Sequence, residues 1–101
     1  MVVQGDVYFI SAERIPHHAA AKKKDHRGFV IAEGEATGHA HVIDDDIELF
    51  EADGTLYVRT VKEVRVTHEE HRPLTLRAGL WRVGRIREYD PFLEEVRLVR
   101  D

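Results

Sequence analysis

The feature that most constrains the fold is a series of short segments in which apolar and polar residues alternate between turn-forming residues. The clearest case is the pair of segments at residues 47–51 and 55–60, which flank Asp53 and Gly54. An Asp-Gly pair between two alternating segments is a strong signal of a β-hairpin. The centre of the chain is therefore expected to form two antiparallel strands.

Similar segments lie on both sides of this hairpin. Strand-like runs occur at residues 7–10, 28–33, 39–43, 61–67, 73–76, 80–89 and 96–99. Turn signals at ~8–12-residue spacing are typical of a β-sandwich or small barrel. The polar residues 11–27 predict a loop, with a short helix near residues 16–25 as the alternative. We predict an all-β fold of about eight short strands, either a small barrel or a sandwich.

Length and composition narrow the class of protein. A chain of 101 residues is expected to form a single β domain over residues 1–101. Because there is no cysteine, disulfides, thiolate metal sites and a cysteine nucleophile are excluded. The N-terminus lacks the pattern of a signal peptide, and no apolar run approaches the ~20 residues of a membrane helix. We therefore expect a cytoplasmic protein with no membrane partner.

Four of the seven histidines form two close pairs in the sequence. His39 and His41 are two residues apart, so in a strand both side chains project from one face. His68 and His71 are three residues apart at the end of a strand, where a bend would turn both toward one cavity. Neutral imidazoles bind divalent transition metals such as zinc, iron, nickel or manganese. We predict a shared metal site, although each histidine could instead face solvent or pack in the core.

Acidic residues near these pairs extend the candidate site. Glu69 and Glu70 are the candidate acid–base groups. A carboxylate ligand, or a group that orients an imidazole, could come from Glu33, Glu35, Glu48 or Glu51. The remaining histidines, His17, His18 and His26, lie in a polar segment and are expected on the surface.

The stretch from Gly34 to His41, with its Gly-His-x-His core, acidic residues after it and then Gly54, resembles the first motif of the cupin superfamily. Cupins are small jelly-roll β-barrels whose histidines and glutamate bind a transition metal, so the resemblance implies such a barrel and a metal site. The match covers about a fifth of the chain. It is one residue short between Gly34 and His39, and it has aspartate where the glutamate is expected. The second cupin motif is absent. The chain also resembles small bacterial and phage proteins that carry Gly-His-x-His and His-Glu-Glu-His segments, a likeness that implies no activity.

Three functions remain open from the sequence. The first is a metal-binding β domain, with or without catalysis, whose substrate is open and for which a small molecule is a possible partner. The second is metal-free acid–base cleavage or binding of RNA, with phosphates held by arginines and bases stacked on Trp81 or Tyr89. The arginines in question are Arg77, Arg82, Arg85 and Arg87. The third is a non-enzymatic module that forms a homo-oligomer or binds a protein through a strand edge.

Overall fold

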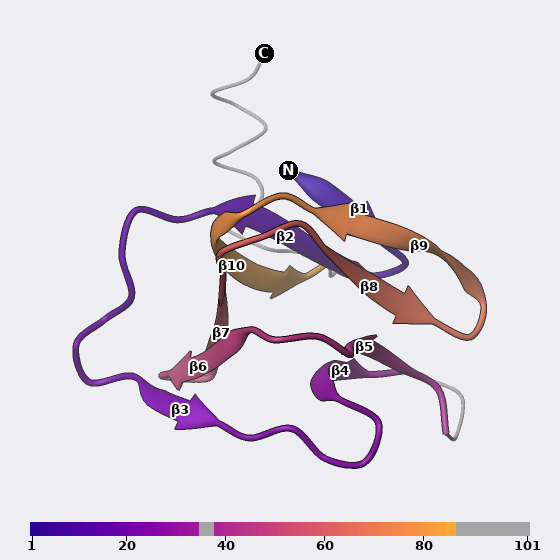
Figure 1. The fold of residues 1–101 in the computed structure, drawn as a ribbon, viewed down its shortest axis with the longest axis horizontal. Helices are drawn as coiled ribbons and strands as arrows, with labels where there is room; N and C mark the ends of the chain where they lie inside the picture. Colours follow the sequence, from indigo (N-terminus) through magenta and orange to yellow (C-terminus); the bar gives the residue numbers. More distant parts are fainter. Residues whose placement is uncertain (35–37, 87–101) are drawn as a thin grey trace.

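The computed structural model describes residues 1–34 and 38–86 and is built from antiparallel β-strands (Figure 1). The ten strands of this part of the chain are β1 (Val2–Gln4), β2 (Val7–Ser11), β3 (Ala20–Lys22), β4 (Phe29–Glu33), β5 (Ala40–Ile43), β6 (Glu48–Ala52), β7 (Thr55–Thr60), β8 (Val64–His68), β9 (His71–Leu76) and β10 (Gly79–Arg85). The all-β prediction is confirmed.

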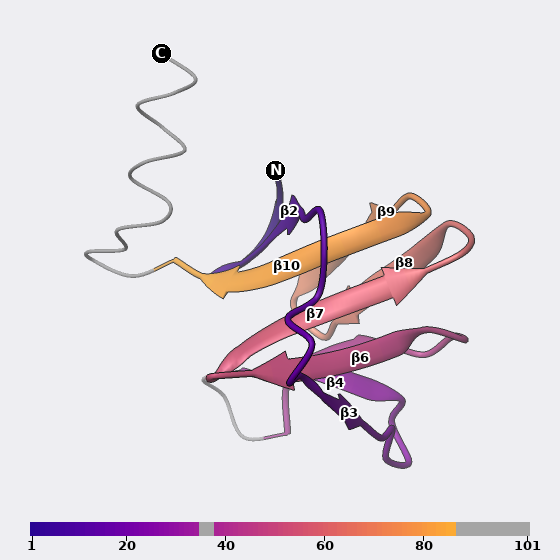
Figure 2. The ribbon, with the colours of Figure 1, turned by 90° about the vertical axis from the view of Figure 1, so that its left-hand side faces the viewer.

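The strands form two sheets. The larger sheet has the order β1-β2-β10-β7-β6-β3, and the smaller has the order β4-β5-β8-β9. Figure 2 shows β10, β7 and β6 running side by side across the front of the molecule, with β8 and β9 behind them. At one edge the sheets approach each other, because β1 lies beside β9. The arrangement is sandwich-like rather than a closed barrel.

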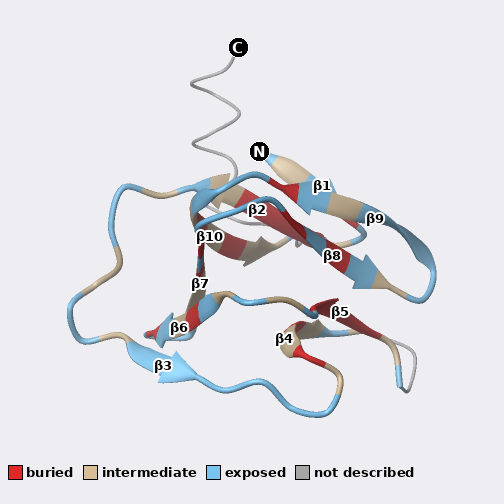
Figure 3. Cartoon of the chain, viewed as in Figure 1, coloured by how far each residue is buried: buried red, intermediate tan, exposed pale blue. Residues whose placement is uncertain are grey.

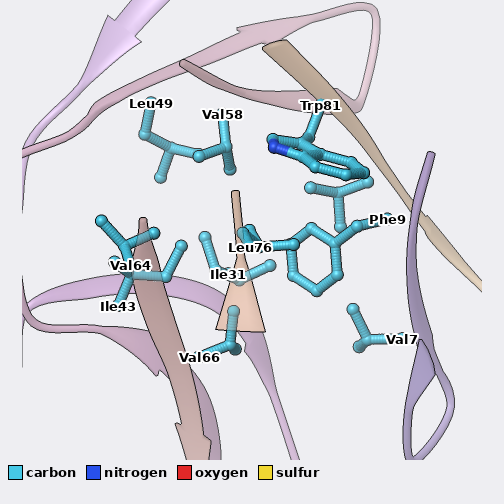
Figure 4. Close-up of a cluster of buried hydrophobic side chains, with 11 residues drawn as sticks. Val7, Phe9, Ile31, Ile43, Leu49, Val58, Val64, Val66, Leu76 and Trp81 are labelled. Atoms are coloured by element: carbon cyan, nitrogen blue, oxygen red, sulfur yellow. The ribbon is translucent and has the colours of Figure 1, made fainter. Parts of the chain in front are cut away.

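The core lies between the sheets and follows the alternation of the sequence. Along β8, Val64 and Val66 are buried while Arg65 and Thr67 are exposed, a pattern that recurs in other strands (Figure 3). Both sheets contribute to the core cluster, in which Trp81 and Phe9 are the largest side chains (Figure 4). Burial of this apolar surface is the main force that holds the sheets together.

The predicted hairpin forms between β6 and β7. Ala52 pairs with Thr55, so Asp53 and Gly54 make a two-residue loop. Their φ angles are 53° and 79°. Positive φ at both central residues is the requirement of a type I′ turn, whose twist matches that of the adjoining strands. Val58 is fully buried and Arg59 exposed, as the alternation in this strand predicts.

Two strands were not expected from the sequence, and the helix considered as an alternative to a loop is absent. β1 precedes the first predicted strand, and β3 lies within the segment interpreted as a loop or a short helix. The helix near residues 16–25 does not form, because a turn and then β3 occupy those positions. β3 is exposed at all three positions, so no apolar pattern marked it. The strand expected at 96–99 lies outside the described residues.

Candidate functional site

Three of the four paired histidines lie in a row across the smaller sheet. His68 ends β8 and His71 begins β9, and they pair directly across a turn made by Glu69 and Glu70. β5 lies on the other side of β8, with Val42 opposite Thr67. Continued by one residue, this antiparallel register brings His41 opposite His68. Cross-strand neighbours lie on the same face of a sheet. The pairing of β5 with β8 and of β8 with β9 therefore places these three imidazoles side by side.

The four imidazole rings are close together in space. Ring centroids are 4.5 Å apart for His41 and His68, 4.6 Å for His68 and His71, and 5.8 Å for His39 and His68. They line a pocket of about 270 Å³, whose full lining is Gly5, Asp6, Gly34, His39, His41, His68, Glu70 and His71. The four histidines that were singled out from the sequence therefore lie at one location.

The turn between β1 and β2 covers one side of this pocket. Gly5 has φ 59° and lies against His71: a Cβ atom at Gly5 would be 2.7 Å from Nε2 of that ring. Glycine at this position therefore serves two purposes, since it allows the left-handed turn and leaves room for the imidazole. Asp6, the next residue, also lines the pocket.

Gln4 connects the two sheets and orients His41. Its Nε2 donates to the carbonyl of Val66 at 3.0 Å and to that of Arg72 at 2.8 Å. Its Oε1 is 2.9 Å from Nδ1 of His41. Because the amide donors face two carbonyls, the side chain must present its oxygen to the imidazole, so His41 carries a proton on Nδ1. In the neutral ring the Nε2 lone pair is then free.

His68 is held in the opposite way. The backbone N–H of Glu70 donates to its Nδ1 at 3.0 Å. That nitrogen acts as the acceptor, so a neutral His68 carries its proton on Nε2. Two neighbouring imidazoles of the same pocket therefore have different tautomers. In each ring the tautomer follows from whether the partner of Nδ1 is a hydrogen-bond acceptor or a donor.

His39 has a buried ring nitrogen without a hydrogen bond. Its Nδ1 is shielded from solvent and has no hydrogen-bond partner among residues 1–34 and 38–86. Oε1 of Glu70 lies 3.7 Å from this nitrogen, which is too far for a hydrogen bond. Leaving a buried polar atom unpaired is costly, so such an atom calls for an explanation. A bound ion at this nitrogen would supply one.

Asp6 and Arg85 form a pair at the rim of the pocket. Nη2 of Arg85 is 2.7 Å from Oδ2 of Asp6, and the other carboxylate oxygen is 3.6 Å from Nε2 of His41. Partial burial opposes ionisation of Asp6, but the hydrogen bond and charge of Arg85 outweigh it and lower the pKa of this carboxyl group. The aspartate is therefore ionised and neutralised by the arginine.

Burial of His41 predicts a pH-dependent stability of the metal-free protein. Burial lowers the pKa of His41 below its ordinary value of 6.5, and the neighbouring His68 lowers it further, whereas Asp6 opposes the shift. The unfolded chain takes up this proton near pH 6.5 and the folded chain only at lower pH, so the free energy of unfolding should fall as pH drops below about 6.5. Urea denaturation in EDTA at several pH values measures this.

The exposed His17 provides the control for that experiment. A His17→Ala variant should reproduce the wild-type pH dependence, whereas His41→Gln should have a shallower slope in the same interval. Equal slopes for His41→Gln and the wild type would show that His41 does not cause the effect.

The two candidate acid–base glutamates have different surroundings. Glu69 accepts a hydrogen bond from the backbone N–H of Ala40 at 2.9 Å, which lowers the pKa of this carboxyl group. Its carboxylate is thereby occupied in joining the β8–β9 turn to β5. Glu70 lines the pocket. Of the two, Glu70 is the one placed to act on a ligand.

Other residues singled out from the sequence lie elsewhere. His17, His18 and His26 are exposed, as expected, with His18 2.9 Å from Asp53. Glu33 binds Arg27, Glu48 binds Arg59 and Glu51 is exposed, so none of the three lines the pocket, and Glu35 lies outside the described residues.

Two of the residues considered for RNA, Trp81 and Arg85, have partners within the described part of the chain. Trp81 is buried in the core, and its Nε1 donates to the carbonyl of Arg77, so its ring is not available to stack on a base. Arg85 is paired with Asp6. Tyr89 and Arg87 lie outside the described residues.

The sequence did not identify Gln4, Gly5 and Asp6 as part of the site. The available signal was a Gly-Asp turn between two short apolar runs, which predicts a hairpin but not what that hairpin covers. Their role depends on β1 lying beside β9, a contact between the ends of the described chain.

The donor atoms are close but are not arranged as a formed metal centre. Within residues 1–34 and 38–86, no group of three or more histidine, aspartate or glutamate side chains is placed so that it could hold an ion. Two imidazoles on one tetrahedral ion have ring centroids about 5 Å apart, given nitrogen–metal distances of about 2.0–2.1 Å. The observed separations bracket that value. The residue types are therefore ones that bind transition metals, but the side chains as placed do not converge on an ion.

Fold and site together define a small antiparallel β-sandwich with a histidine-lined pocket at one end of its core. The chain belongs to the family described as Domain of unknown function (DUF8820), whose model matches residues 3–86. The comparisons with curated proteins and with solved structures gave no match. No helix of the described part of the chain is long and apolar enough to cross a membrane.

Proposed function

We propose that this protein binds a divalent transition-metal ion in the histidine-lined pocket. The ion would be held by His39 and His41 together with at least one of His68 and His71. Zinc, iron, nickel and manganese all accept such a ligand set. The partial likeness of residues 34–41 to the first cupin motif supports the same interpretation.

The observation that carries this proposal is the hydrogen bond between Gln4 and Nδ1 of His41. Histidines that bind metals usually donate their second ring N–H to a neighbouring acceptor, which fixes the tautomer and the ring orientation. Here Gln4 is the acceptor and His41 is the ring. The His41 ring is 1% exposed and has two further imidazoles stacked or tilted beside it. The buried, unpaired Nδ1 of His39 adds a second nitrogen in need of a partner.

Each part of the pocket would have a defined task around such an ion. Gln4 orients His41. Asp6 and Arg85 neutralise each other at the rim of the pocket, so that they add no net charge near the ion, and Glu70 offers a carboxylate at the opening of the pocket. A divalent ion with an open position would supply Lewis acidity toward a bound oxygen. The pocket is then suited to binding a small molecule. With Glu70 as a proton acceptor, it is also suited to catalysis on that molecule.

Metal content tests the proposal directly. The protein is purified without a histidine tag, incubated in turn with zinc, nickel, manganese and ferrous salts, dialysed and subjected to elemental analysis. We expect near-stoichiometric metal in the wild type and its loss in the His39→Ala/His41→Ala variant, since two of the nitrogen ligands are removed.

The matched control is His17→Ala/His18→Ala, which removes an exposed histidine pair and should leave the metal content unchanged. A wild-type chain that retains none of these metals, or equal retention by both double variants, would rule out the proposed site.

A further inference from the structure

Two hydrogen-bond acceptors face each other inside the pocket. Gln4 accepts the Nδ1 proton of His41, so the other ring nitrogen, Nε2, presents a lone pair. Oδ1 of Asp6 lies 3.6 Å from this nitrogen, beyond hydrogen-bond distance. Neither atom has a proton to give to the other, because Asp6 is ionised beside Arg85. A group that donated an N–H to each of the two atoms would supply what the pair lacks.

The Nε2 atom of His41 cannot turn elsewhere for a partner. His41 is only 1% exposed, and within residues 1–34 and 38–86 this nitrogen has no hydrogen bond. An unpaired polar atom on so buried a side chain carries a desolvation cost. Gln4 holds the ring by its other nitrogen, so the ring cannot rotate without breaking that bond. The lone pair is therefore fixed beside a pocket that both His41 and Asp6 line.

The charge of the pocket favours a cationic donor over a neutral one. Asp6 and Arg85 offset each other, with 2.7 Å between their nearest atoms. Glu70 also lines the pocket, and it forms no ion pair with a lysine or arginine of the described residues. When the imidazoles are neutral, the lining therefore keeps the negative charge of Glu70 without compensation. Such a lining attracts a positively charged group.

An ammonium group has the properties that this lining requires. It carries three N–H donors and no acceptor. The lining offers three acceptors, which are Nε2 of His41, Oδ1 of Asp6 and the carboxylate of Glu70. The pocket volume, about 270 Å³, is at or below the ~300–1,000 Å³ of pockets for drug-sized ligands. The ligand that carries the ammonium group is therefore expected to be small.

We propose that the metal-free pocket binds the ammonium group of a small primary amine, which donates to Nε2 of His41 and Oδ1 of Asp6 while Glu70 balances its charge. This inference goes beyond the proposed metal ion and does not rest on it, because it uses the side chains as they are placed. Both ligands need Nε2 of His41, so an amine and a metal ion would compete for the pocket.

The proposal is tested in EDTA by adding methylammonium chloride to protein labelled with ¹⁵N-histidine. At a pH of about 8, well above the ordinary histidine pKa of about 6.5, the ¹⁵N resonance of Nε2 in His41 reports whether its lone pair accepts a hydrogen bond. We expect this resonance to move upfield and to saturate. Tetramethylammonium chloride has the same charge but no N–H, so it should leave the resonance unchanged at equal ionic strength. Equal responses to the two salts, or no response to methylammonium, would overturn the proposal.

Substitutions of the two carboxylates identify the groups that hold the ligand. Glu70→Gln removes a charge but keeps the backbone N–H that binds His68. It should weaken methylammonium binding about two- to fivefold, as expected for an exposed charge. Asp6→Asn should weaken binding about tenfold or more, because the amide loses the charge and can itself donate to Nε2 of His41. Glu51→Gln, at an exposed position of β6, is the matched control and should bind as the wild type does.

The variants also define the results that would contradict the proposal. Wild-type affinity in Asp6→Asn, or an equal loss in Glu51→Gln and Glu70→Gln, would show that methylammonium does not bind at these acceptors. Because the titration is carried out in EDTA, its failure leaves the metal site standing. A failure of metal uptake likewise leaves the amine site standing.

Discussion

Replacing Gln4 by alanine should lower the free energy of unfolding by about 3 kcal/mol, because three polar groups lose their partner at once. The carbonyls of Val66 and Arg72 lose a donor, and Nδ1 of the buried His41 loses its acceptor. Metal affinity should fall by roughly 10–100-fold, since the ring that offers Nε2 is no longer oriented. Urea denaturation in EDTA measures the first effect and metal titration the second.

A Gln4→Glu variant separates the two effects. Glutamate keeps an oxygen for the N–H of His41 but cannot donate to either carbonyl, and it brings a negative charge close to both. It should therefore destabilise the metal-free fold while retaining more metal affinity than Gln4→Ala. Equal loss of affinity in both variants would contradict the role given to the amide oxygen.

Arg59→Ala provides the stability control for these measurements. Arg59 and Glu48 form an exposed ion pair on the larger sheet, at 2.8 Å. Exposed pairs of this kind contribute about 0–1 kcal/mol. A comparable loss in Arg59→Ala and Gln4→Ala would show that the effect at Gln4 is not specific to the buried network.

Much of the fold could be predicted because its strands obey local rules. The alternation around Val58, the Asp53-Gly54 turn and the shared face of Trp81 and Val83 each depend on neighbours in sequence, and each is present in the structure. Period-two alternation shows which side of a strand is buried. It does not show which strands pair, so the order of the two sheets could not be predicted.

The convergence of the four histidines was predictable, but their separate chemistry was not. His41 lies in β5 and His39 directly precedes that strand, and both line the pocket. The two-residue turn between His68 and His71 pairs those two. The tautomers depend instead on Gln4, which is 37 residues from His41, and on the backbone of Glu70. Such a long-range hydrogen bond leaves no periodic trace in the sequence.

β3 was missed for a different reason. Its three residues are exposed, and it pairs with β6 at the edge of the larger sheet. An edge strand without a buried face needs no apolar alternation, and charged residues such as those around Lys22 are typical of edges that avoid further pairing. The same composition predicted a loop or a helix equally well.

Replacing Gly84 by alanine should destabilise the protein by about 3 kcal/mol through a steric clash in the larger sheet. Gly84 in β10 pairs with Tyr8 in β2, and the phenol ring of Tyr8 lies across it. A Cβ atom at Gly84 would overlap Cζ and Oη of that ring. Since Tyr8 is only 2% exposed, the ring has little freedom to move aside. Urea denaturation of the variant measures the loss.

The clash can be isolated with a second substitution at Tyr8. A leucine there lacks the outer ring atoms that the new methyl group would meet, so Gly84→Ala should cost almost nothing in a Tyr8→Leu background. It should even be slightly stabilising, because alanine restricts the unfolded chain more than glycine does. Such non-additivity between two contacting residues is the mark of a direct interaction. Equal costs in the two backgrounds would mean that Gly84 is required for a reason other than the ring of Tyr8.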